Sequence, residues 1–250
     1  MTNPYLLMLL SQESKFTNDD SESSDTETVS SKSDTITPLI TTTVTPTAIP
    51  ISTPAITWKK KLENAREYVI NNSDIETAFT MGPCCGFYAL SVILNFYDIN
   101  NKPFQGVSSL YKIAKDVGFT TKGELYSAYF MAELASFVNC GYRIYHKWDA
   151  STIISIINKE HPVLVSFDVD KKGGICFQKG QSAHWGIIED IRGDKVIVSH
   201  GWSDVKYEWD IDDLIRSNQQ LEKTIYYETP NKIYDCSHLR NKIIEILPPQ

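Results

Sequence analysis

The pattern of apolar residues changes its period part-way along the chain. Between residues 58 and 141, apolar positions recur every three or four residues, which is the spacing of amphipathic helices. Four helices are predicted there, over residues 58–71, 85–97, 108–118 and 122–141. Gly118 and Gly141 stand at the ends of the last two and are expected to end them in the left-handed conformation.

After residue 141 the apolar positions alternate or form short runs, as they do in strands. Strands are predicted over 142–148, 161–169, 183–191, 195–202, 205–209 and 223–228. The third and fourth form a hairpin around a turn at Arg192-Gly193-Asp194. Short helices are expected over 149–160, where Asp149 caps the first turn, and over 210–218. Helices come first and a mostly antiparallel sheet follows, so the predicted fold class is α+β.

Residues 1–57 show neither the helical nor the strand spacing of apolar residues. They are rich in Ser, Thr and Asp and then in Thr and Pro, and they cannot bury enough apolar surface to offset chain entropy. We therefore expect a disordered acidic segment over 1–57 and one folded domain over 58–250.

Charge and hydropathy exclude two classes of partner. Residues 1–57 hold seven acidic residues and two lysines, a net charge of -5, which leaves -2 of the total of -7 for the folded part. Such a body lacks the basic surface that nucleic acids require, and no run approaches the roughly 18 apolar residues of a membrane span. The protein is interpreted as cytoplasmic, with no nucleic acid or membrane partner.

The cysteines are an odd and scattered set, which argues against a disulfide framework. They are Cys84, Cys85, Cys140, Cys176 and Cys236. The adjacent pair lacks the Cys-x2-4-Cys spacing of zinc sites, so neither a metal nor an organic cofactor is predicted. The last three are interpreted as small buried hydrophobes.

The adjacent cysteines stand where a helix is predicted to begin. The stretch "MGPCCGFYAL" places Cys84 and Cys85 between a Gly-Pro turn and an apolar helical run. Free N–H groups and the dipole at a helix start favour an anion such as a thiolate. A free cysteine is only about 3% ionised near neutral pH, and a helix terminus rarely contributes more than ~2 kcal/mol. A cationic histidine is therefore expected beside the sulfur, as counter-ion and as proton donor to a leaving amine.

Among the five histidines, His184 fits this role best. It opens the predicted strand "HWGIIEDI", so its ring would be held at one end of the sheet while Trp185 points to the other face. His200 would lie beside it if the hairpin pairs around its predicted turn, and it would fix the tautomer of His184. Asp204 and Asn218 are alternatives for that orienting role. The remaining three are interpreted as structural or solvated: His146, His161 and His238.

Four segments together resemble one family. The segments "GPCCGFYAL", "AHWGII", "SHGWSDVKYEW" and "LIRSNQQL" are similar to those of the actin maturation proteases, papain-like cysteine peptidases related to the C39-like peptidases. The resemblance covers Gly82 to Leu221. It implies a papain-like fold and a thiol aminopeptidase that removes the N-acetylated first residue of immature actin. The nucleophile of the family precedes the glycine, so the resemblance assigns this role to Cys85.

Two positions depart from the wider papain-like pattern. A glutamine usually precedes the nucleophile as an oxyanion donor, whereas "ETAFTMGPC" has none, so Thr80 or backbone N–H groups near Cys85 would have to serve. His200 stands where Asn or Asp is common. These departures motivate a second hypothesis, a catalytically inactive papain-like module that binds peptide termini. A third is a C39-like peptidase or another Cys-His acyl transferase with a different substrate.

A glycine-rich loop ahead of His184 carries three lysines, Lys171, Lys172 and Lys179. Its structural interpretation is a solvated mobile loop. If the chain acts on actin, as the resemblance implies, these lysines would attract the acidic N-terminus typical of actins. The resemblance also suggests profilin as a partner of the proline-containing N-terminal segment, although this segment lacks long polyproline runs.

Overall fold

A computed structural model of the chain describes residues 57–72, 84–98, 106–201, 205–225 and 233–249. The predicted division at residue 57 stays a prediction, because residues 1–56, to which the predicted disorder and the suggested profilin contact refer, lie outside the described residues. The helices are α2 (Trp58–Asn72), α4 (Cys85–Phe96), α5 (Val107–Asp116), α6 (Ala128–Ser136), α7 (Ala150–Ile157) and α8 (Ile211–Gln219), with a short 3-10 helix η1 (Ser237–Leu239). The strands are β1 (Cys140–His146), β2 (Val163–Val169), β3 (Ile175–Cys176), β4 (Ala183–Arg192), β5 (Lys195–His200), β6 (Lys206–Asp210), β7 (Lys223–Ile225), β8 (Ile233–Asp235) and β9 (Lys242–Pro249).

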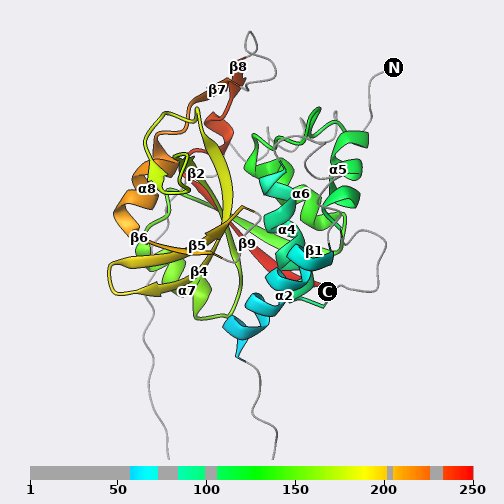
Figure 1. The fold of residues 1–250 in the computed structure, drawn as a ribbon, viewed down its shortest axis with the longest axis horizontal. Coiled ribbons are helices and arrows are strands. Elements are labelled where there is room, and N and C mark those ends of the chain that lie inside the picture. Colours follow the sequence, from blue (N-terminus) through cyan, green and yellow to red (C-terminus); the bar gives the residue numbers. More distant parts are fainter. Residues whose placement is uncertain (1–56, 73–83, 99–105, 202–204, 226–232, 250) are drawn as a thin grey trace, which may run out of the picture. The chain divides into compact units, whose positions relative to one another are not determined.

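An antiparallel sheet runs through the described part of the chain (Figure 1). Its strands follow the order β1-β9-β2-β4-β5-β6, and β3 pairs with β2 at its side. All its pairings are antiparallel. Strands β7 and β8 form a separate antiparallel pair. The predicted α+β class with an antiparallel sheet is therefore confirmed.

Helices pack on both faces of this sheet. Figure 1 shows α2, α4, α5 and α6 gathered on one side, with α7 and α8 on the other. Between the sheet and the second pair lies a cluster of buried side chains: Trp148, Ile153, Ile156, Ile157, Val163, Val165, Phe167, Ile188, Val196, Val198, Trp209, Ile211, Leu214 and Ile243. None of the helices in the described ranges combines the length and apolar character that a membrane crossing requires.

Helix α4 is apolar on nearly all sides because it is enclosed by its neighbours. All its residues from Gly86 to Phe96 are buried, and it packs against α2 and β4. A Cβ on Gly86 would lie 2.7 Å from Met131 Cε and 3.1 Å from Trp185 Cδ1. The missing side chain thus lets the first turn of α4 approach β4 closely, and Cys85 comes with it.

The predicted helix over 122–141 is too long. Helix α6 begins only at Ala128, because the Ser127 side chain caps it by accepting a hydrogen bond from the backbone N–H of Phe130. The predicted stop at Gly141 is also wrong. Asn139 takes the left-handed conformation with a φ of 63°, and Gly141 already belongs to β1.

Several other predicted features are confirmed, whereas three strands were not predicted. Helix α4 begins at Cys85, Asp149 caps α7 by accepting a hydrogen bond from Thr152 N–H at 2.8 Å, and Gly193 forms the hairpin turn with a φ of 64°. The sequence pattern predicted neither the short strands β3 and β8 nor β9, which lies inside the sheet between β1 and β2.

Candidate active site

The two adjacent cysteines differ in exposure. Cys85 is the first residue of α4 and is partly exposed, whereas Cys84 is buried. Backbone N–H groups of Trp185, Gly86 and Cys85 itself form hydrogen bonds to the Cys85 sulfur, and each favours the thiolate. Trp185 directly follows His184, so the sulfur lies against the stretch of β4 that carries the predicted histidine. The structure thus brings these two distant segments together.

Although part of the Cys85 residue is exposed, desolvation of its sulfur opposes a charge on the thiol. Desolvation raises the pKa of Cys85 and outweighs the hydrogen bonds from the three N–H groups, which lower it. Desolvation likewise lowers the pKa of His184 to about 4. The helix start therefore acts in the predicted direction, but the structure favours a neutral thiol and a neutral imidazole. The predicted resting thiolate-imidazolium pair stays a prediction, against which the burial of both groups acts.

His184 lies at the second position of β4, opposite Phe167 of β2. Its ring stands edge-on to the rings of Phe167 and His200, with centroid distances of 6.3 and 4.9 Å. Its Nε2 is buried and has no hydrogen-bond partner within the described part of the chain. The side chain of Trp185 leaves the strand on the other face, as predicted, and its indole N–H donates to the Leu125 carbonyl at 2.9 Å.

His200 lies beside His184, as the hairpin predicted. The pairing is diagonal, because the residue directly opposite His200 is Gly186. The His200 ring stacks on Tyr207 at 4.5 Å, and its Nε2 lies 2.9 Å from the Gly173 carbonyl oxygen. Desolvation and the neighbouring His184 lower the pKa of His200 to about 4, although the Gly173 carbonyl acts in the opposite direction. The His200 ring is therefore also neutral.

Asn218 and Asp204 are the two alternatives to His200 as the residue that orients His184. Asn218 is fully buried, its Oδ1 accepts a hydrogen bond from the Trp148 indole at 3.1 Å, and its Nδ2 donates to the Ser166 carbonyl at 2.9 Å. These bonds tie α8 to β2, which gives Asn218 a structural role instead of the predicted orienting one. Asp204 and the proposed oxyanion residue Thr80 lie outside the described residues.

The loop with the three lysines is held by hydrogen bonds at its base. Lys171, Lys172 and Lys179 are all exposed. The fully buried carboxylate of Asp168 accepts hydrogen bonds from backbone N–H groups at residues 178, 180 and 182, at 2.8, 2.9 and 3.1 Å. This differs from the expected solvated mobile loop. Because the Gly173 carbonyl contacts His200, the loop also reaches the candidate site.

The sequence analysis missed Asp168, although a signal was present. An acidic residue in the otherwise apolar strand "VLVSFDV" must find donors if it is buried. The segment "LIRSNQQL", the motif that ends the family resemblance, supplies one donor, because the amide of Gln220 donates to the Asp168 carboxylate at 2.6 Å. The Ser217 hydroxyl accepts from the backbone N–H of Asp168 and donates to the Cys176 carbonyl, each at 2.9 Å. In this structure the motif therefore connects α8, β2 and the lysine loop.

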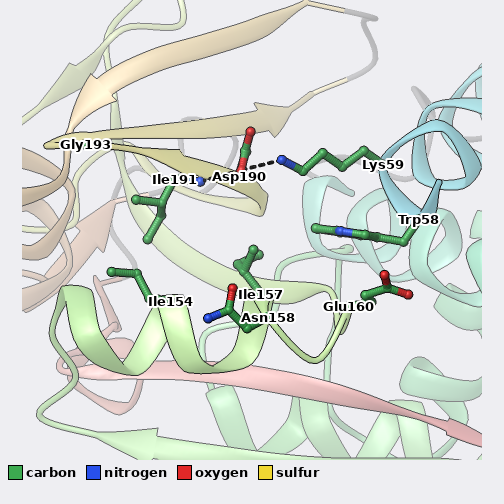
Figure 2. A pocket seen from close by; sticks show the side chains of 9 residues that line it. All are labelled: Trp58, Lys59, Ile154, Ile157, Asn158, Glu160, Asp190, Ile191 and Gly193. Atoms are coloured by element: carbon green, nitrogen blue, oxygen red, sulfur yellow. Dashed lines mark hydrogen bonds and ion pairs between the residues drawn. The ribbon is translucent and has the colours of Figure 1, made fainter.

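A pocket of about 560 Å³ lies away from this site. Figure 2 shows its lining, which joins Trp58 and Lys59 of α2 to residues of α7 and of the turn after β4. An ion pair of 2.6 Å between Lys59 and Asp190 crosses it. Because Asp190 and His184 stand near opposite ends of β4, the pocket is separate from the candidate active site.

Comparison with known proteins finds one related family. A family model described as "Actin maturation protease-like, C-terminal domain" matches residues 75–191. The chain is related to the actin maturation protease family. The predicted resemblance is thereby confirmed, and the matched range contains Cys85 and His184, whereas His200 lies beyond it.

Individual actin maturation proteases support this relationship. The protein of that name from Danio rerio is 28% identical over 153 residues, which cover 57% of this chain and 49% of the relative. Its counterpart from Drosophila melanogaster is 28% identical over 159 residues, covering 60% and 57%. The Homo sapiens protein is 24% identical over 154 residues, covering 58% and 43%. The chain thus spans about half the length of the curated relatives it matches.

The neutral state of Cys85 can be tested by alkylation. Only the thiolate reacts, and the raised pKa keeps the thiol protonated, so the alkylation rate should rise about tenfold per pH unit between about pH 6 and 8. The measurement follows iodoacetamide labelling of the peptide that contains residue 85, in a Cys84→Ala background. A rate that is already constant across this range would instead reveal a stable thiolate-imidazolium pair.

Proposed function

We propose that this protein is a cysteine aminopeptidase that removes the N-acetylated first residue of immature actin, giving the mature N-terminus. Cys85 is the nucleophile, His184 is the general base and His200 orients His184. One observation carries the proposal: the Cys85 sulfur lies at the start of a buried helix, against the stretch of β4 that carries His184. The name shared by the relatives, actin maturation protease, supports actin as the substrate.

The proposed mechanism starts from the neutral pair. His184 takes the proton of the Cys85 thiol while the sulfur attacks the carbonyl carbon of the acetylated first residue. Protonated His184 then donates this proton to the leaving amine of the second residue, and the first residue stays bound to Cys85 as a thioester. Water, deprotonated by His184, hydrolyses the thioester and restores the thiol. These steps require neither a metal nor an organic cofactor.

The N–H groups at the sulfur support this order of events. Their hydrogen bonds stabilise negative charge on Cys85, but desolvation prevents that charge from forming at rest. Charge therefore develops on the sulfur only as the proton moves to His184, when the N–H groups are already in place. The residue that stabilises the oxyanion is part of the same proposal, with Thr80 and backbone N–H groups near Cys85 as candidates.

A papain-like fold belongs to the same proposal. Its support is the arrangement of a helix with cysteine at its first residue, packed against an antiparallel sheet in which one strand carries histidine. A cytoplasmic location is proposed as well, because the substrate is newly made actin.

Incubation of the purified full chain with an acetylated actin N-terminal peptide tests the function. The proposal predicts that the acetylated first residue and the shortened peptide appear together in the mass spectrum. The alternative of an inactive module that binds peptide termini predicts binding without release. Equal release from acetylated peptides of unrelated sequence would favour a C39-like peptidase with a different substrate.

The three loop lysines are proposed to attract the acidic substrate. Replacement of Lys171, Lys172 and Lys179 by alanine should raise KM for the actin peptide by about tenfold at low salt and flatten its salt dependence, with kcat preserved. The matched control replaces three exposed lysines elsewhere: Lys112, Lys115 and Lys147. An unchanged salt dependence in the first triple variant would refute this role.

A further inference from the structure

A hydrogen bond to the backbone defines the tautomer of His200. Its Nε2 lies 2.9 Å from the Gly173 carbonyl oxygen, and a carbonyl oxygen can only accept. Nε2 of His200 therefore carries the hydrogen. In a neutral imidazole the other nitrogen, Nδ1, is then an acceptor.

The ring of His184 lies beside that of His200. The two rings lie 4.9 Å apart between centroids and are inclined at 80°. Nε2 of His184 is buried and has no hydrogen-bond partner in the described ranges, which is costly for a polar atom. The other rings around His200 are the aromatic side chains of Phe167, Tyr207 and Trp209.

The Gly173 carbonyl is held in place by a turn built on Asp170. The Asp170 carboxylate accepts hydrogen bonds from the backbone N–H groups of Lys172 and Gly174, at 2.7 and 2.8 Å. The backbone of Asp170 adds two more, to the Gly174 carbonyl at 2.8 Å and from the Gly173 N–H at 3.1 Å. Four hydrogen bonds thus fix the peptide that faces His200.

Gly173 itself is required by this geometry. Its φ is +83°, a conformation that other residues rarely adopt, and a Cβ there would lie 2.9 Å from Cζ of Tyr207. Tyr207 stacks on His200, so the turn, Tyr207 and the histidine ring form one packed unit.

We propose that Asp170 is a positioning residue: through the Gly173 carbonyl it locks His200 in the Nε2–H tautomer, which leaves Nδ1 of His200 as an acceptor beside the ring of His184. An acceptor at this place favours the His184 tautomer with its hydrogen on Nε2, and the unprotonated Nδ1 of that tautomer can take the proton of Cys85. The catalytic consequence rests on the proposed function, whereas the tautomer of His200 does not. Asp170 touches neither the substrate nor the reacting atoms.

Nitrogen-15 NMR of the full chain, labelled at histidine, tests this role directly. The His200 signals, assigned by comparison with His200→Gln, should show a protonated Nε2 and an unprotonated Nδ1. Asp170→Ala should give a mixture of the two tautomers and lower kcat about tenfold, with KM within about twofold of the wild type. Asp170→Asn retains a side-chain oxygen for both N–H groups and should restore the spectrum and kcat. Asp116→Ala, which removes an exposed acid on α5, is the matched control.

Two results would overturn the positioning role: a protonated Nδ1 on His200 in the wild type, or an unchanged spectrum in Asp170→Ala. If Asp170→Ala does not fold, the wild-type and Asp170→Asn spectra still decide the tautomer. The spectra need no turnover, so the two proposals can fail separately. Predicted tautomers without release of an acetylated residue would refute the peptidase and retain the tautomer lock.

Discussion

Replacement of Cys85 by alanine is expected to reduce release of the acetylated first residue of the actin peptide by about 10⁴-fold or more. Alanine leaves no atom that can form the thioester, while the backbone N–H groups at the start of α4 remain. Cys84→Ala should stay within a few fold of the wild type, because Cys84 is buried, with 4% of its surface exposed. Its main cost is a small cavity, about 1 kcal/mol of unfolding free energy.

Initial rates with purified variants, together with thermal unfolding to confirm folding, separate these outcomes. Peptide binding should persist in Cys85→Ala, since binding does not require the sulfur. A folded Cys85→Ala protein that still releases the acetylated residue at a near-normal rate would rule out this nucleophile. A loss confined to Cys84→Ala would move the chemistry to the neighbouring sulfur.

Replacement of His184 by alanine should be nearly as severe, with a loss of about 10³-fold to 10⁴-fold in kcat. This variant has no internal base for the Cys85 thiol. Because burial raises the pKa of Cys85, the thiol stays protonated near neutral pH and must lose its proton to solvent. The residual rate should therefore increase with pH through the neutral range. In the wild type, where His184 has a pKa of about 4 and is already an unprotonated base, the rate should depend less on pH above that value.

His238→Ala is the matched control, since His238 is exposed in η1 and should be dispensable. The pH profiles of kcat for the two variants and the wild type give the measurement. Comparable loss in both histidine variants, or a His184→Ala profile parallel to that of the wild type, would contradict the base assignment.

The parts of the site that follow from local chemistry were predictable from the sequence. The Gly-Pro turn followed by an apolar run marks the helix start at Cys85, and burial of α4 explains why that run is apolar on all sides. The turn at Gly193 sets the register of the β4–β5 hairpin, and this register brings His184 and His200 together. Both the helix start and the hairpin turn are determined by residues close to one another in the sequence.

The charge state and the supporting contacts were not predictable in the same way. The pKa of Cys85 depends on how closely the chain packs around the sulfur, whereas the sequence shows only the opposing effect of the helix start. No side chain marks the position of the Gly173 carbonyl in the sequence, because that position depends on the left-handed conformation of Gly173 itself. Both therefore depend on tertiary structure.

Strand β9 was not predicted for a similar reason, because it too depends on tertiary contacts. It contains Glu245, a charged residue that is fully buried inside a sheet. The carboxylate accepts a hydrogen bond from the Tyr145 hydroxyl at 2.5 Å and lies 2.6 Å from Nδ1 of His161, across 100 and 84 residues of sequence. Together with Arg143 and Lys159, which also pair with it, these distant partners make a buried glutamate tolerable, so the local pattern predicted no strand.

Trapping the covalent intermediate tests the central claim most directly. The full chain is mixed with the acetylated actin peptide, quenched in acid during the first turnovers and analysed by tandem mass spectrometry. We expect the acyl group of the acetylated first residue as a thioester on Cys85, on the peptide that also contains the unmodified Cys84. Product release with the acyl group on another residue, or with no acyl-enzyme under any quench condition, would contradict the account.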